Sequence, residues 1–351
     1  MPTVLWWGRT DRNYSRNRII LDLFSDLGWN IDFFHPVSSP LGRAQAFFKR
    51  PRKPQLIWVP CFRQRDVHSA VTWARRWKCP LVFDPLISAY QKEVFEKGKW
   101  SPDEGPAAKL RSWEAGLYRQ ADLVIADTRL HARFFADTFA LDPDKVCVIY
   151  VGADDTVFRP LDAGPERSPI EVLFYGSFLA LQGPDVIIDA AREIENKEIQ
   201  WVLLGDGDLR ARLEERSRNL PNIRFEPWTP YEHLPRRLSR AHILLGIFGT
   251  TPKAAMVIPN KVFQAMAMAR PLITRRSEAF PHQLRNSEVI GWVPPGDARA
   301  LADKVTEMAA DPNGLIERGR QTRQLYDEYF SLDHIRSQLQ TALDKVMAVR
   351  R

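Results

Sequence analysis

The chain has 351 residues, which is enough for two domains that each bury a core of their own. Hydrophobic residues make up 44% of it and charged residues 26%, as in ordinary globular proteins, and no apolar run is long enough to predict a transmembrane helix. The net charge of +7 comes mostly from residues 1–160, which hold 24 Lys and Arg against 18 Asp and Glu.

The cysteines and histidines are too scattered to predict a disulfide framework or a metal site. The first apolar run is too short for a signal peptide and predicts a strand instead. We therefore expect a cytoplasmic protein that needs no metal.

The first half of the chain alternates short apolar runs with helical segments. We expect strands at 3–7, 31–34, 56–60, 81–83, 123–126 and 146–151. We expect helices at 17–27, 66–77, 129–139 and, with a break, 89–118. Continuous apolar strands separated by helices predict a parallel sheet that is covered on both faces.

A basic segment runs from Arg43 to Lys53 and includes Phe47 and Phe48. One interpretation is a solvated loop. The other is a surface that binds an anionic membrane, which would place the protein peripherally on the inner membrane face. Nucleic acid is not expected as a partner, because no binding module surrounds the segment.

Proline, glycine and charged residues replace the apolar rhythm at 158–168, which predicts a linker, and the α/β alternation then restarts. We expect strands at 171–175, 200–204, 223–225, 243–248, 272–274 and 289–293. We expect helices at 184–194, 209–219, 231–239, 262–268 and 332–349, with others from 298 and 315. These patterns predict an α/β protein of two Rossmann-like, doubly wound domains at 1–160 and 161–330, facing each other across a cleft. The helix after 331 is expected to pack back on the first domain.

The most informative stretch is 251–274, where a polar loop leads into a short helix and then a strand. Pro259 suits a first helical turn, Asn260 is a good N-cap, and Val262 begins the apolar face. The free amides of such a helix start bind anions, and Lys261 would add a mobile positive charge. Gln264 shares a helix face with Asn260. The plain alternative is an ordinary capped strand–helix–strand unit.

Other strand-end turns of the second half are candidates for the same site. Two glycines in each of two turns allow close backbone approach to a ligand. The residues concerned are Gly176, Ser177, Gln182 and Gly183 in the first turn, and Gly205, Asp206 and Gly207 in the second. Any tight strand–helix turn also favours glycine, so each turn alone is a weak signal.

The first half offers a second group of strand-end residues. Gly8, Arg9, Tyr14 and Arg16 follow the first strand, and Asp84 and Asp127 follow later ones. Arg16 is expected at the cleft mouth, within reach of a bound ligand, with a plain surface arginine as the alternative. Asp84 is equally explained by a turn-capping role.

The stretch with Gly246, Phe248, Gly249, Thr251-Pro252-Lys253-Ala254 and Ile258 to Val262 resembles the donor-binding segment of retaining family 4 glycosyltransferases, which have the GT-B fold. The resemblance implies transfer of a hexose from a nucleotide-diphosphate sugar to a glycan or lipid-linked acceptor, with no metal, in polysaccharide or glycoconjugate synthesis. Lys253 and the turns described above would line the donor site, with Lys261 stabilising the leaving diphosphate. Trp228 and Thr229 would flank the base, Gln264 would hold the ribose, and Arg16 and Asp84 would face the acceptor.

The sequence departs from the family pattern at four positions. Ser177 and Gln182 stand where many relatives have a basic pair for the diphosphate. Met256 and Gln264 stand where they have two glutamates. A catalytically silent relative that serves as a binding or scaffold subunit is therefore the main alternative. A sugar-nucleotide epimerase and a nucleotide-binding oxidoreductase are less favoured, because the acid–base groups of the one and the third glycine of the other are missing.

Overall fold

The structure is a computed structural model that describes residues 1–161, 168–194 and 198–348. Its contacts divide the chain into unit 1, Met1–Val151 with Leu332–Arg351, and unit 2, Gly152–Ser331. The division lies at 151/152, earlier than the expected boundary at 160/161, and the last helix groups with unit 1. Residues 162–167 of the expected linker lie outside the described residues.

Unit 1 contains a parallel six-stranded sheet in the order β2-β1-β3-β4-β5-β6. Its strands are β1 (Thr3–Trp7), β2 (Asn30–Phe34), β3 (Leu56–Val59), β4 (Leu81–Phe83), β5 (Leu123–Ala126) and β6 (Val146–Val148). Its α-helices are α1 (Ser15–Asp26), α2 (Gly42–Lys49), α3 (Val67–Trp77), α4 (Ala89–Gln91), α5 (Gly105–Tyr118), α6 (Arg129–Phe139) and α15 (Leu332–Ala348).

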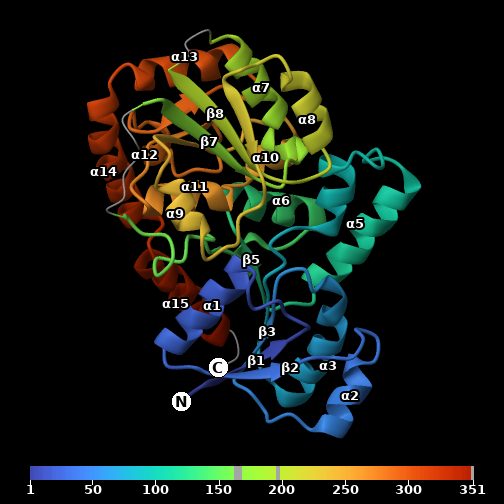
Figure 1. Cartoon of the computed structure of the whole chain (residues 1–351). Helices are drawn as coiled ribbons and strands as arrows, with labels where there is room; N and C mark the ends of the chain where they lie inside the picture. The colour runs from blue at the N-terminus through green and yellow to red at the C-terminus, as the bar shows by residue number, and fades with distance from the viewer. Residues whose placement is uncertain (162–167, 195–197, 349–351) are drawn as a thin grey trace. The chain divides into compact units, whose positions relative to one another are not determined.

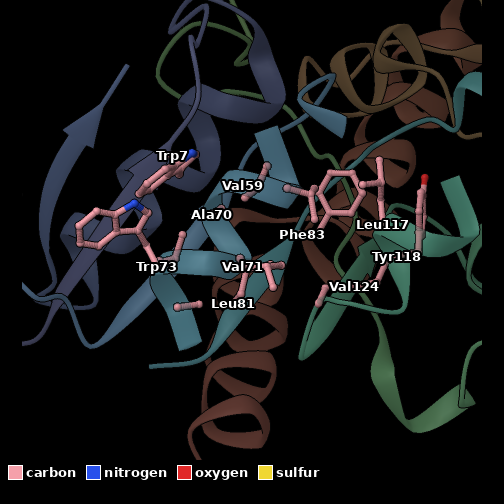
Figure 2. Close-up of a cluster of buried hydrophobic side chains, with 14 of the residues drawn as sticks. Trp7, Val59, Ala70, Val71, Trp73, Leu81, Phe83, Leu117, Tyr118 and Val124 are labelled. Atoms are coloured by element: carbon pink, nitrogen blue, oxygen red, sulfur yellow. The ribbon is translucent and has the colours of Figure 1, made fainter. Parts of the chain in front are cut away.

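The central strands of unit 1, β1, β3, β4 and β5, are largely buried because their side chains meet helices. In the cluster of Figure 2, Trp7 and Trp73 lie toward one end and Phe83, Leu117 and Tyr118 toward the other. The rings of Phe83 and Tyr118 meet edge to face at 5.1 Å, so α5 is fixed against the carboxyl end of β4.

Unit 2 contains a second parallel six-stranded sheet, in the order β12-β11-β10-β7-β8-β9. Its strands are β7 (Ile170–Gly176), β8 (Ile199–Gly205), β9 (Ile223–Glu226), β10 (Ile243–Leu245), β11 (Leu272–Arg275) and β12 (Gly291–Val293). Its α-helices are α7 (Pro184–Arg192), α8 (Arg210–Ser217), α9 (Leu234–Leu238), α10 (Pro252–Met256), α11 (Asn260–Ala267), α12 (His282–Arg285), α13 (Ala298–Ala309) and α14 (Pro312–Tyr329). The expectation of two doubly wound parallel sheets is confirmed.

Helices form at three places where none was expected: α2, α10 and α12. The segment interpreted as a basic loop is largely α2, whose Ala46 is fully buried. The polar loop before α11 contains α10, which the hydroxyl of Thr251 caps by accepting a hydrogen bond from the Ala254 amide at 3.2 Å. Short helices of this kind depend on caps and packing rather than on a periodic apolar pattern.

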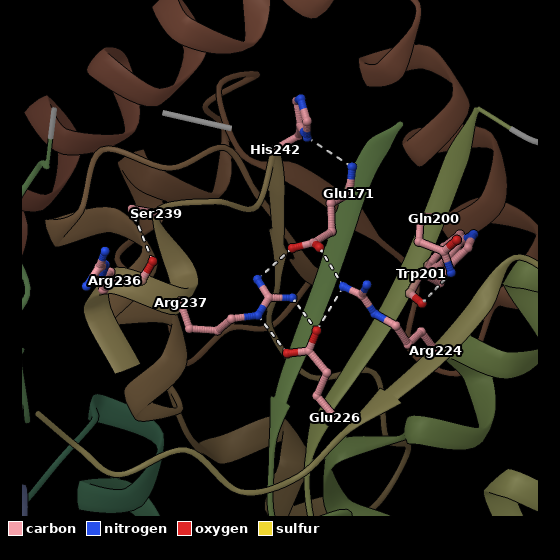
Figure 3. A network of polar contacts seen from close by, with 9 residues as sticks. All are labelled: Glu171, Gln200, Trp201, Arg224, Glu226, Arg236, Arg237, Ser239 and His242. Atoms are coloured by element: carbon pink, nitrogen blue, oxygen red, sulfur yellow. Dashed lines mark hydrogen bonds and ion pairs between the residues drawn. The ribbon is translucent and has the colours of Figure 1, made fainter. Parts of the chain in front are cut away.

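A network of ion pairs ties α9 to the sheet of unit 2 (Figure 3). Arg237 of α9 binds Glu171 of β7 at 2.7 Å and Glu226 of β9 at 2.6 Å, and Arg224 also contacts both carboxylates. Burial alone would raise the pKa of Glu226, but hydrogen bonds from Arg237 and Arg224 outweigh it and hold that pKa below its ordinary value. The network therefore joins two strands that are not neighbours in the sheet.

Candidate functional site

Helix α11 carries the residue around which the candidate site of unit 2 is built. Lys261 is 6% exposed, and its Nζ donates a hydrogen bond to Oε1 of Gln182 at 3.1 Å. The same ammonium lies 3.7 Å from the ring centroid of Phe174. Burial lowers the pKa of the Lys261 amine well below its ordinary value. The expectation of a mobile lysine is wrong, because the side chain is packed and hydrogen-bonded.

The start of α11 also differs in detail from the expectation. Asn260 is the first helical residue rather than the N-cap; Pro259 takes the cap position and makes no side-chain cap. The Val262 amide bonds to the Pro259 carbonyl at 2.9 Å. Because the first turn of a helix has few intrahelical acceptors, anion binding by its amides stays a prediction that this geometry allows.

Glycines bring the strand-end backbones together beside Lys261. A Cβ on Gly176 would lie 2.6 Å from Oε1 of Gln182 and 3.0 Å from Nζ of Lys261, so this glycine leaves room for their contact. At Gly205 a Cβ would meet the Gly176 carbonyl at 2.0 Å. Gly183 has φ +67°, and a Cβ there would lie 2.5 Å from the Gly249 amide nitrogen. We call Phe174, Tyr175, Gly176, Gln182, Lys261 and Gln264 the Lys261 cradle.

Tyr175 completes the cradle from the end of β7. Its hydroxyl donates to Oε1 of Gln264 at 2.9 Å and lies 3.2 Å from the Lys261 carbonyl. Gln264 is 7% exposed. Burial raises the pKa of Tyr175 well above its ordinary value, so the phenol stays a proton donor. Sequence reasoning missed Tyr175, because a tyrosine in an apolar strand gives no signal beyond packing.

The other expected donor-site residues are distributed around this cradle. Ser177 and Asp206 are exposed, and the Asp206 carboxylate accepts a hydrogen bond from the Gly207 amide at 2.8 Å. Trp228 is 63% exposed and Thr229 is half-buried, in the loop after β9, whereas Lys253 is buried in α10. Their contacts with a nucleotide sugar stay predictions.

Arg210 and Arg275 also support the strand ends, and sequence reasoning did not single them out. Arg210 donates to the carbonyls of Gly205 and Glu226, and Arg275 donates to the Gly249 carbonyl at 2.5 Å. Nothing in the sequence pattern distinguishes such backbone-holding arginines from surface ones. They fix the loops from which the cradle is made.

Unit 1 gathers several of its expected site residues at the carboxyl ends of its strands. Nε of Arg16 donates to Oδ2 of Asp84 at 2.9 Å, and its Nη1 donates to the carbonyls of Ile149 and Tyr150. Arg16 is 1% exposed and Asp84 2%. Burial raises the pKa of Asp84 and nearby Asp127 adds to the effect, although Arg16 opposes it. The alternative of a plain surface arginine is wrong, because Arg16 is buried. Contact of Arg16 with an acceptor stays a prediction.

The remaining first-half candidates surround that ion pair. Asp127 forms a short contact with Nδ1 of His131, a fully buried histidine whose other nitrogen meets the Gln91 side chain. Tyr14 packs its ring against Phe62 at 5.0 Å, and burial raises the pKa of its phenol. Gly8 has φ +144° beside Arg63, whereas Arg9 is exposed. These residues shape the strand ends, and their roles toward an acceptor remain to be tested.

A second surface of unit 1, which we call the α2 surface, lies over α2 and α3 and includes the basic segment from Arg43 to Lys53. The two helices line a cavity of about 450 Å³, whose walls are Arg43, Ala44, Phe47, Phe48, Thr72, Trp73 and Arg76. Phe47 is 54% and Phe48 81% exposed. No helix among the described residues is long and apolar enough to cross a bilayer, and no group of three or more His, Cys, Asp or Glu in the same ranges is placed to hold a metal ion.

Both halves of the chain match domain models of glycosyltransferases. Residues 23–152 match the model described as "Glycosyl transferase 4-like domain", and residues 169–311 match "Glycosyl transferases group 1". By its fold and by these two matches, which together span most of its length, the chain belongs to the GT-B glycosyltransferases, the class of enzymes that transfer sugars on this fold.

Curated relatives and solved structures agree with this class. A putative colanic acid biosynthesis glycosyltransferase, WcaL, of Escherichia coli K12 is 24% identical over 235 residues, 65% of this chain and 57% of the relative. A D-inositol 3-phosphate glycosyltransferase of Acidothermus cellulolyticus is 31% identical over 127 residues, 34% of this chain and 28% of the relative. The matches thus span about half or less of these relatives.

Among solved structures, Anabaena Alr3699/HepE in complex with UDP superposes with a TM-score of 0.72 at 14% identity, over 98% of this chain and 100% of the other. Sucrose-phosphate synthase of Thermosynechococcus elongatus superposes with a TM-score of 0.74 at 17% identity, over 99% and 100%. At such identities the likeness shows the fold alone.

Proposed function

We propose that the protein moves a hexose from a nucleotide-diphosphate sugar to a glycan or lipid-linked acceptor, with retention of configuration, in the synthesis of cell-surface polysaccharide or glycoconjugate. The observation that carries the proposal is the amine of Lys261, buried at the carboxyl end of β7 beside the first turn of α11. Support comes from the relatives named for glycosyl transfer and from the HepE structures determined with UDP and UDP-glucose.

The chemistry follows from charge that develops on the leaving group. The bond between the anomeric carbon and the donor phosphate breaks, and the anomeric carbon bonds to the acceptor oxygen. The acceptor hydroxyl gives its proton to the departing phosphate. A buried amine and helix-start amides stabilise the growing negative charge without reorganising in the reaction. We propose that these groups make a metal unnecessary, which activity retained in EDTA would support.

The test is a thermal-shift panel with UDP, GDP, ADP and dTDP. A ligand at about 100 times its Kd stabilises the folded state by about 2.7 kcal/mol, which a melting curve resolves. We expect one diphosphate to raise the Tm of the wild type and of Lys304→Ala, a matched lysine substitution on α13, but not that of Lys261→Ala. If no diphosphate shifts the folded wild type, the silent binding subunit becomes the better proposal.

We also propose that unit 1 touches the anionic, cytoplasmic face of a membrane through the α2 surface, which would bring a lipid-linked acceptor to the enzyme. No acidic residue occurs between Asp32 and Asp66, whereas Arg43, Lys49, Arg50, Arg52 and Lys53 all lie in this interval. Exposed aromatic rings beside basic residues fit the interface of an anionic bilayer.

A further inference from the structure

The cavity of the α2 surface has a largely hydrocarbon lining. Its apolar walls are the methyl group of Ala44 and the rings of Phe47, Phe48 and Trp73. Trp73 is 7% exposed, and its Nε1 donates to the Arg43 carbonyl at 3.2 Å, which joins α3 to α2. An indole has one N–H group, so Trp73 has no polar hydrogen left for a ligand and offers only its carbon surface.

Two arginines place positive charge on this apolar cavity. Arg43 of α2 and Arg76 of α3 both line it, and both are exposed. The Arg76 guanidinium lies 5.3 Å from the ring centroid of Trp73, so it is held against the apolar wall. Helix α3 contains no Asp or Glu, and in the described part of the chain neither guanidinium forms an ion pair. Both cations are therefore available to an anion.

The cavity lies away from the strand ends that carry the candidate site of unit 1. At the start of α3, Oγ of Ser69 accepts from Nε1 of Trp7, the last residue of β1, at 3.0 Å. Arg76 lies about two helical turns further on, where α3 leads into the amino end of β4. Asp84 follows the carboxyl end of that strand. A molecule in the cavity is thus not an acceptor in position to react beside Asp84.

We propose that the cavity binds one hydrocarbon chain of an anionic membrane lipid, with the lipid phosphate on Arg43 and Arg76, as an anchor separate from the acceptor. The chain would cover the exposed rings of Phe47 and Phe48, and guanidinium groups bind phosphate oxygens in a fork. A volume of about 450 Å³ is in the range of ligand pockets. A second copy of this chain would bring the same cations against this surface, so charge favours the lipid.

The deciding probe is dodecyl phosphate below its critical micelle concentration, so that no bilayer is present, measured by titration calorimetry. We expect saturable binding to the wild type, and Kd weaker by about tenfold or more for butyl phosphate, which lacks most of the chain. Equal binding of the two phosphates would overturn the proposal by showing a plain anion site. Arg43→Gln with Arg76→Gln should weaken dodecyl phosphate binding several-fold, and an unchanged Kd would remove the role of the arginines.

Cavity-filling variants test the location of the chain. Ala44→Trp fills the cavity without changing the charge and should weaken dodecyl phosphate binding about tenfold or more. Ala348→Trp makes the same change on exposed α15 of unit 1 and should leave Kd unaltered. Thr72→Phe fills the cavity from α3 and replaces Ala44→Trp if that variant does not fold. Wild-type affinity in a folded filled variant would overturn the proposal.

The inference rests on the proposed membrane contact of unit 1, and the two fail differently. A wild type that sediments with anionic liposomes but does not bind dodecyl phosphate removes only the lipid cavity. A wild type that does neither removes the membrane contact as well, whereas the nucleotide panel tests sugar transfer independently. A wild-type dimer that Ala44→Trp dissociates, without any lipid binding, would assign the cavity to a second copy of the chain.

Discussion

Burial lowers the pKa of the Lys261 amine well below its ordinary value, and a bound diphosphate would raise it again by favouring the charged form. Binding should therefore take up protons. The affinity should be full below the lowered pKa of the free protein and should fall as the pH rises through it. It should level off above the higher pKa of the complex. Calorimetry in two buffers with different ionisation heats measures this uptake.

Lys261→Met provides the control for proton uptake. It should abolish the uptake together with the affinity. It should also leave the Tm of the free protein unchanged or raised, because a buried amine without a carboxylate partner costs stability. Equal proton uptake by wild type and variant would assign the titration to another group.

Variants of the ion pair between Arg16 and Asp84 can distinguish a structural role of these side chains from a role in acceptor binding. Arg16→Met leaves a buried carboxylate without its cation and should cost about 3–5 kcal/mol of unfolding free energy. The double variant Arg16→Met, Asp84→Leu should recover most of that loss in chemical denaturation. If the double variant is stable and still transfers sugar, neither side chain serves the acceptor.

At the scale of elements, the turns beside the cradle depend on glycines, because a side chain at these positions would clash with neighbouring backbone. Gly183→Ala would place a Cβ 2.5 Å from the Gly249 nitrogen at φ +67°. Gly28 has a similar φ of +74° but nothing within 4 Å of the corresponding Cβ. We expect Gly28→Ala to cost about 1 kcal/mol, as the backbone penalty alone, and Gly183→Ala clearly more. Equal costs in urea denaturation would show that the turn can relax around the added methyl.

The strands were predictable because each is a continuous apolar run between helices. Thr3–Trp7, Leu81–Phe83 and Leu123–Ala126 have the bounds expected, and the other strands differ by a few residues at their ends. The expected strand at 243–248 ends at Leu245; Gly246 and Ile247 still bond to β11, and the Phe248 amide then bonds to the Gln182 carbonyl. Strand ends are set by such tertiary contacts, which a local pattern does not contain.

The candidate site was predictable in its location but not in its hydrogen bonding. The glycines and Lys261 indicated the strand ends of unit 2, because backbone approach and positive charge leave a sequence signal. Neither the contact of Tyr175 with Gln264 nor that of Lys261 with Gln182 leaves one, since both join residues 79 or more positions apart.

At the scale of the whole molecule, the net charge of +7 is uneven, and the α2 surface concentrates it. Neutralising Lys49, Arg50, Arg52 and Lys53 should release the protein from anionic liposomes, at about 1 kcal/mol for each charge near the surface. The matched control removes Arg212, Arg218, Arg299 and Arg320, four exposed charges of unit 2. Equal co-sedimentation of the two quadruple variants would refute a membrane role for α2.

The return of α15 to unit 1 has a consequence for synthesis on the ribosome. Buried Ile335, Leu339 and Leu343 and the bond from the Tyr150 amide to Gln338 belong to the core of the unit whose sheet is translated first. The first unit to emerge is thus the last to be finished, and it must wait for the whole of unit 2 to be translated. A stop codon or frameshift just after residue 331 would therefore remove part of the core of unit 1, the N-terminal unit, and leave unit 2 complete.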